Sequence, residues 1–212
     1  GDPLLSTFIS YPEGELARLV FHELAHQVAY APGDTVFNES FATAVERLGV
    51  QRWLDARASQ SSDEARQVYA TFDARRQQFR ALTLETRREL AVIYDGKEAV
   101  AQYPRSQEAI KNIAMQRFRD NYAQLKASWG GYSGYDPWVA RANNASLSAQ
   151  AAYDELVPGF EALFEREGRD WQRFYDAVNQ LARLPRHERH AILNTNKLPP
   201  ARELAVMLLE VH

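Results

Sequence analysis

Apolar residues recur at helical spacing along almost the whole chain after Pro12 and Gly14, and this pattern limits the fold most strongly. No segment alternates polar and apolar residues clearly enough to predict a sheet. Residues 1–14, which hold apolar residues between two prolines, are interpreted as one short extended segment. We therefore predict a mainly α fold.

Turn signals divide the helical pattern into separate elements. A first helix is expected at 15–30, and a second at 38–57 with Asn38 as its N-cap. Two long helices, separated by a break near Asp95-Gly96, predict an antiparallel hairpin. The long helices are expected at about 61–94 and 106–129, a loop rich in Gly and Tyr at 130–138, and shorter helices at about 145–156, 158–167, 170–184 and 200–210.

These elements suggest three segments along the chain. Residues 1–60 contain the first two helices and the metal-binding motifs described below. Residues 61–129 form the long hairpin. Residues 130–212 contain the Gly/Tyr loop and the C-terminal helices, as one compact unit.

Composition excludes several classes of protein. The 212 residues include no Cys, which excludes disulfides, Cys-ligated zinc and thiol catalysis. A net charge of −3 gives no field that attracts nucleic acid, and no apolar run is long enough to span a membrane. Any metal chemistry must therefore use His, Asp and Glu, and two of the five His lie four residues apart.

The first helix carries the pattern His-Glu-x-x-His at residues 22–26. His22 and His26 lie about 40° apart around a helix, so that both imidazoles can converge on one metal ion. Glu23 lies beside them, where it can act as a general base on a water molecule. Leu16, Val20 and Leu24 fall on the opposite side, which we predict to be a buried apolar back.

A catalytic zinc needs a third protein ligand. Glu39 follows His26 with twelve residues between, at the start of the next helix, and a turn at 31–37 could bring it back to the His pair. Asp34, in the turn itself, is an alternative. Glu46 lies seven residues after Glu39 on nearly the same helical face. It could accept a hydrogen bond from a ligand histidine, or it could be an ordinary solvated residue.

The two motifs resemble those of the gluzincin metallopeptidases. Aminopeptidases of the leukotriene A4 hydrolase and aminopeptidase N type carry HELAHQ, then NEGFA, with a further glutamate seven residues after the first glutamate of that motif. Residues 22–27 read HELAHQ and residues 38–42 read NESFA here, with Glu46 at the matching distance. The chain departs from that pattern at Ser40, where those enzymes have glycine, and in a shorter spacer.

The sequence resembles more closely a bacterial family of predicted zinc aminopeptidases, whose members are often described as lipoproteins. This resemblance extends over most of the chain. The matching positions include residues 21–49, 129–131, 138, 143–145, 153, 157–158, 160, 170–171 and 174–175.

The resemblance implies a zincin-like helical metallopeptidase domain with one bound Zn²⁺. It implies that His22, His26 and Glu39 are the zinc ligands, and that Glu23 is the general base for a zinc-bound water. It also implies that Glu46 holds a ligand histidine in place. A bacterial envelope or periplasmic location follows from the same resemblance, with a lipid anchor before Gly1 as one option.

Two elements of the aminopeptidase pattern have no match in the sequence. One is the Gly-Ala-Met-Glu-Asn segment that holds the free amine of the substrate. The other is a sheet upstream of the first helix, whose edge strand pairs with the substrate backbone in zincins. We expect the upstream β-sheet to belong to a part of the protein before Gly1.

Five further residues are candidates for contact with the substrate. Tyr135 is the expected catalytic stabiliser of the oxyanion, with Tyr132 beside it in the loop and Tyr153 as a third candidate. Asn143 and Asn144 could bind the substrate backbone. Aromatic packing is the alternative for the tyrosines, and helix capping is the alternative for the asparagines.

Two other groups of charged residues are interpreted as solvated helix faces. The first is the pair His187 and His190, for which a second metal site is the alternative. The second is the Arg-rich part of the long hairpin, whose arginines alternate with acidic residues. A partner-binding arm is the alternative for the hairpin.

The sequence as a whole predicts a zinc-dependent peptidase, with an aminopeptidase as the expected type. A zinc endopeptidase is one alternative. Another is a non-catalytic helical scaffold, in which the zinc is structural and the hairpin binds a protein partner. The expected substrate is a peptide or protein, and the sequence does not define the oligomeric state.

Overall fold

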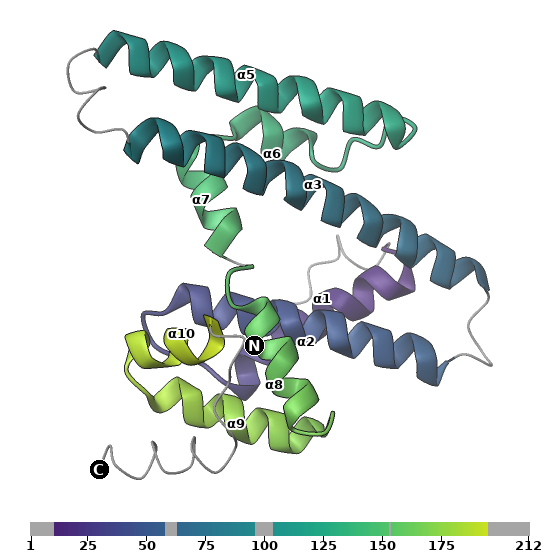
Figure 1. The fold of residues 1–212 in the computed structure, drawn as a ribbon. Helices are drawn as coiled ribbons and strands as arrows, with labels where there is room; N and C mark the ends of the chain where they lie inside the picture. The colour runs from purple at the N-terminus through teal and green to yellow at the C-terminus, as the bar shows by residue number, and fades with distance from the viewer. Residues whose placement is uncertain (1–10, 58–62, 96–103, 153, 195–212) are drawn as a thin grey trace. The chain divides into compact units, whose positions relative to one another are not determined.

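The computed structural model describes residues 11–57, 63–95, 104–152 and 154–194. These residues form helices and connecting turns, with no strand among them, which confirms the mainly α fold (Figure 1). The helix expected at 200–210, most of the extended segment and Tyr153 lie outside the described residues. The helices are α1 (Glu13–Val28), α2 (Thr35–Ala56), α3 (Asp63–Asp95), α5 (Pro104–Ser128), α6 (Asp136–Arg141), α7 (Asn144–Ala152), α8 (Val157–Arg166), α9 (Trp171–Arg183) and α10 (Arg186–Asn194).

The chain divides into two compact units. Residues 1–69 and 152–212 form one, called here the terminal unit, and residues 70–151 form the other, called here the hairpin unit. The expected C-terminal segment, 130–212, is thus shared between the two units. In the part of the chain that the structure describes, no helix has the length and apolar character needed to cross a membrane.

Phenylalanines from three helices form the core of the terminal unit. Phe37 and Phe41 of α2 are fully buried, and Phe160 of α8 packs against both, with ring centroids 5.1 and 5.6 Å away. Phe174 of α9 lies 5.9 Å from Phe41. Large buried rings dominate core energetics because each removes more than about 150 Å² from water. The core therefore fixes α2, the helix that carries the NESFA motif.

The turn before α2 is built differently from the expectation. Asp34 is the N-cap, and its side chain accepts a hydrogen bond from the backbone N–H of Phe37 at 3.2 Å. The predicted cap at Asn38 is therefore wrong, and the helix begins one turn earlier. Asn38 is buried and pairs with both backbone groups of Ala31, at 2.8 and 3.0 Å. This double hydrogen bond closes the turn between α1 and α2.

Two small residues let α8 pack closely in the same unit. Ser40 of α2 is fully buried, and its hydroxyl accepts a hydrogen bond from the N–H of Leu156, the N-cap of α8, at 3.3 Å. A Cβ at Gly159 would lie 2.2 Å from the carbonyl oxygen of Leu193 in α10. Only glycine fits at this contact. Ser40, the position that departs from the gluzincin pattern, thus links the motif helix to α8.

The hairpin unit contains the antiparallel pair that the sequence predicts, α3 beside α5 (Figure 1). Phe79 of α3 packs against Tyr122 of α5, and Glu89 pairs with Arg117. From Phe79 to Glu89 the chain moves forward along α3, while the partner residue moves back along α5 from Tyr122 to Arg117, as an antiparallel arrangement requires. The loop expected at 130–138 ends earlier than predicted, because α6 begins at Asp136.

Candidate metal centre

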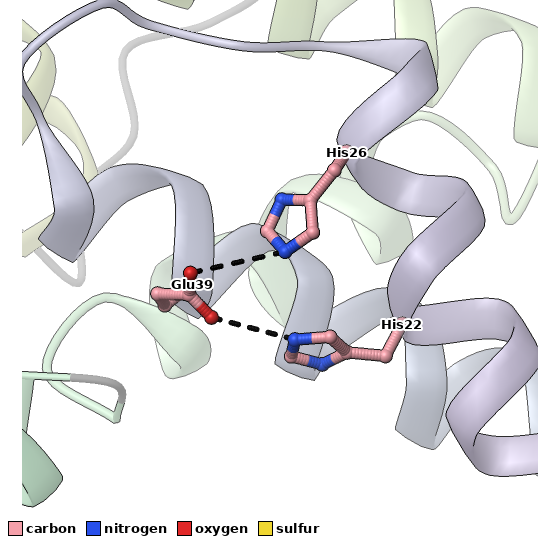
Figure 2. A group of neighbouring side chains, drawn as sticks. All are labelled: His22, His26 and Glu39. Carbon is pink, nitrogen blue, oxygen red and sulfur yellow. Dashed lines mark ion pairs between the residues drawn. The ribbon is translucent and has the colours of Figure 1, made fainter. Parts of the chain in front are cut away.

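Three potential metal ligands meet between α1 and α2 in the terminal unit. His22 and His26 project from α1, and Glu39 projects from α2 toward both rings (Figure 2). Nε2 of His22 lies 3.4 Å from one carboxylate oxygen of Glu39, and Nε2 of His26 lies 3.8 Å from the other. One ligand atom from each residue lies within 4.8 Å of the other two. Elsewhere in the described ranges, no comparable His, Asp and Glu group of three is found.

These distances and donor types fit a zinc ion. Zinc binds His nitrogen and carboxylate oxygen at about 2.0–2.2 Å in tetrahedral geometry, so neighbouring donor atoms lie about 3.3 Å apart. The His22–Glu39 separation of 3.4 Å is close to that value. Both Nε2 atoms lie too far from the carboxylate for an ordinary hydrogen bond, which ends near 3.2 Å. The His26–Glu39 separation is longer, at 3.8 Å, and all three ligand atoms lie within 4.8 Å of one another, which is compatible with a shared cation.

The side chains of the three candidate ligands are only partly covered. Relative exposures of the side chains are 17% for His22, 22% for His26 and 20% for Glu39. Structural zinc sites are closed by four protein ligands, whereas catalytic sites keep a position for water or substrate. A group of three partly exposed ligands matches the second kind of site.

Glu46 of α2 contacts His22 from the side opposite Glu39. Its Oε2 lies 3.0 Å from Nδ1 of His22, and the residue is 7% exposed, so it is not a solvated helix residue. An ionised Glu46 can only accept a hydrogen bond, so Nδ1–H of His22 donates it. A neutral His22 then has its lone pair on Nε2, the atom that faces Glu39. Nδ1 of His26 has no hydrogen-bond partner among the described residues, so only one ligand histidine is oriented in this way.

The charges around His22 shift the pKa of both partners. Burial by itself lowers the pKa of His22. The hydrogen bond to Glu46 and the charges of Glu46, Glu39 and Glu23 outweigh this effect, so the net pKa of His22 lies above its ordinary value of 6.5. Burial raises the pKa of Glu46, but His22 and Arg18 together bring it below 4.5. The site thus has an excess of negative charge, as a cation site requires.

Glu23 lies on the exposed surface of α1, directly after His22. Its charge contributes to the raised pKa of His22, which places the carboxylate near the ligand group. Nothing in the described contacts fixes its side chain. Its role as a general base stays a prediction.

The predicted apolar back of α1 is wrong. Leu24 is 54% exposed, and Leu16 and Val20 are only partly covered. The face of α1 that packs on α2 is the face with the ligands, where the ring of Phe21 lies 3.0 Å from the Cβ position of Gly49. Helical spacing identified two opposite faces, but it could not tell which of them meets the neighbouring helix.

The four other expected site residues belong to the hairpin unit. Tyr135 stacks on Phe79 at 4.1 Å, and Arg75 lies over the ring of Tyr132 at 4.5 Å. Asn143 accepts a hydrogen bond from the N–H of Ser146 at 3.1 Å, as a helix cap does. Asn144 begins α7. Contacts of these four residues with a substrate stay predictions.

Asp34 and His190 form a contact for which the sequence carries no local signal. Asp34 is 1% exposed, and Nε2 of His190 lies 2.9 Å from its Oδ2. Arg189 pairs with the same oxygen at 2.9 Å. The interpretation of His190 as a solvated residue is therefore wrong. His187, with 83% of its side chain exposed, is solvated as predicted. Asp34 is occupied by these partners, which leaves Glu39 as the third ligand candidate.

The described residues define a helical protein with a candidate metal centre of two histidines and one glutamate. The family model described as "Putative aminopeptidase" matches residues 1–193, and the chain belongs to this family. No curated protein and no solved structure matches the chain.

Proposed function

We propose that this protein is a zinc-dependent peptidase of the aminopeptidase type, with His22, His26 and Glu39 as the zinc ligands. The observation that carries the proposal is the convergence of their three ligand atoms within 4.8 Å. Family membership supports a peptidase, and the HELAHQ and NESFA motifs support a gluzincin relationship. A bacterial envelope location is part of the proposal and rests on sequence resemblance alone.

In this proposal, the residues around the ligands perform separate tasks. A bound zinc ion supplies Lewis acidity, which polarises the substrate carbonyl and makes water a better nucleophile. Glu23 takes the proton from the attacking water and returns it to the leaving amine. Glu46 holds His22 with Nε2 toward the ligand group, at the hydrogen-bond distance of 3.0 Å.

The partial exposure of the ligands favours this proposal over a scaffold with structural zinc. The preference for an aminopeptidase over an endopeptidase depends on the family description and on the motif resemblance.

A peptide-library digest with the zinc-loaded full-length protein tests the proposal. We expect products that lack N-terminal residues, whereas internal cleavage would support the endopeptidase. Glu23→Gln is the key variant, because it keeps a similar shape but cannot act as a base. It should retain one zinc per chain by metal analysis and lose turnover by a factor of at least about 100. Full activity of Glu23→Gln, or a protein that binds no zinc, would contradict the proposal.

A further inference from the structure

Arg18 lies behind the metal centre, one turn before His22 on α1. Its Nη1 donates to both carboxylate oxygens of Glu46, at 3.1 and 3.0 Å. The same Glu46 accepts the hydrogen bond from His22. Arg18, Glu46 and His22 therefore form a continuous chain of contacts that ends at the ligand group. Arg18 belongs to neither of the two sequence motifs.

The surroundings hold the Arg18 guanidinium in place. Its Nε lies 3.5 Å from the carboxylate of Glu15, a buried residue on the same helix. One side of the guanidinium thus faces Glu15 and the other faces Glu46. A guanidinium keeps its charge at all working pH values and its donors have a fixed geometry, which suits it to orient a buried carboxylate.

Glu46 needs such a partner because it is buried. A buried carboxylate with a single hydrogen bond is unfavourable, and its side chain would turn toward solvent if it could. Arg18 engages both oxygens and leaves Oε2 directed at Nδ1 of His22. Without Arg18, no guanidinium would hold the Glu46 carboxylate in the orientation that accepts the hydrogen bond from His22.

We infer that Arg18 is a positioning residue of the metal centre, which fixes Glu46 so that His22 presents Nε2 to the cation. This inference rests on the proposed zinc site and adds a residue to it. The expected effect on zinc affinity is about 3- to 10-fold. This is smaller than the 10- to 100-fold typical of a residue that contacts a ligand directly, because Arg18 acts through Glu46.

The direction of the change in zinc affinity distinguishes two effects of Arg18, the positioning of Glu46 and the charge of the guanidinium. Arg18 is a cation near a cation site, so removing its charge would by itself strengthen zinc binding. Arg18→Gln should instead weaken zinc binding if the residue positions Glu46. Arg18→Lys, which keeps the charge and can still donate to Glu46, should restore at least part of the affinity.

The experiment measures zinc affinity by competition with a chromophoric chelator, and thermal unfolding of the metal-free proteins. Arg47→Gln is the matched control, because Arg47 is adjacent to Glu46 in sequence but pairs with Asp154 and Glu161. The control should bind zinc with an affinity within about 2-fold of the parent. An equal or tighter affinity in Arg18→Gln would overturn the inference.

A double-mutant cycle tests whether Arg18 acts through Glu46. In a Glu46→Ala background, Arg18→Gln should no longer weaken zinc binding by more than the roughly 2-fold limit of additivity. The same 3- to 10-fold loss in both backgrounds would overturn the inference, because Arg18 would then act by another route. A parent protein that binds no zinc would overturn the proposed function itself, which keeps the two failures distinguishable.

Discussion

Nδ1 of His22 and Oε2 of Glu46 lie 3.0 Å apart, and this contact joins the two helices that carry the sequence motifs. Among the described residues, it places a buried acceptor behind His22, whereas Nδ1 of His26 has no hydrogen-bond partner. The two histidines of the HELAH motif are therefore not equivalent. Substitutions that break this contact should affect zinc binding through His22 alone.

Glu46→Ala should lower the affinity for zinc about 10- to 100-fold, because His22 loses the acceptor that fixes its tautomer and ring orientation. The measurement is the same chelator competition, with one zinc per chain still expected at saturating metal. Glu161→Ala, which removes a partly exposed carboxylate of α8, is the control and should leave the affinity unchanged. An unchanged affinity in Glu46→Ala would show that the contact does not support the ligand.

Zinc should raise the thermal stability of the parent protein, because a ligand that binds only the folded state stabilises it. At free zinc about 100-fold above the dissociation constant, the gain is about 2.7 kcal/mol, or roughly 5–10 °C in Tm for a chain of this size. His26→Ala and Glu39→Ala should each lose most of this shift. EDTA should reverse it in the parent.

His187→Ala is the control for nonspecific effects of histidine removal, because its side chain is 83% exposed. It should keep the full zinc-dependent shift in Tm. If zinc stabilised His187→Ala, His26→Ala and Glu39→Ala equally, the three proposed ligands would not form the binding site.

The sequence predicted local features of the site more successfully than long-range ones. Spacing along one helix predicts that His22 and His26 share a face, because that geometry is local. The pairing of Asp34 with His190 joins residues 156 positions apart and has no local signal. The same limit explains why the predicted burial of Leu24 is wrong, since periodicity identifies an apolar face but not the neighbour that covers it. The position of Glu39 near the two histidines depends on the turn between α1 and α2. The two hydrogen bonds between Asn38 and Ala31 that close this turn were not evident in the sequence.

Asp34→Ala should destabilise the protein by about 3–5 kcal/mol, because it leaves the charge of Arg189 uncompensated and buried. It also removes the N-cap of α2. Urea denaturation of the metal-free protein measures the change. Asp176→Ala, at an exposed position of α9, should change the free energy of unfolding by less than about 0.5 kcal/mol. A similarly small change for Asp34→Ala would show that the cluster contributes little to stability.

Asp154 should make the stability of the protein depend on pH between about 4 and 6. Its carboxylate lies 3.5 Å from Arg47 and has 9% side-chain exposure. Burial raises its pKa, Arg47 lowers it and Glu46 raises it, with a net value of about 6 against the ordinary 3.8. The folded state therefore binds this proton more tightly than the unfolded state does. Its contribution to stability is complete below about pH 4 and is lost as the pH rises through 6.

Asp154→Asn removes this titration and keeps the shape of the side chain. The free energy of unfolding of the variant, relative to the parent, should rise by about 2 kcal/mol from pH 4 to pH 7, because only the parent loses stability over that range. Urea denaturation in the presence of a chelator measures it without the pH dependence of zinc binding. Asp176→Asn controls for loss of an exposed carboxylate in the same unit. A difference between Asp154→Asn and the parent that stays constant with pH would show that folding does not raise the pKa of Asp154, since a group with equal pKa in both states leaves no such slope.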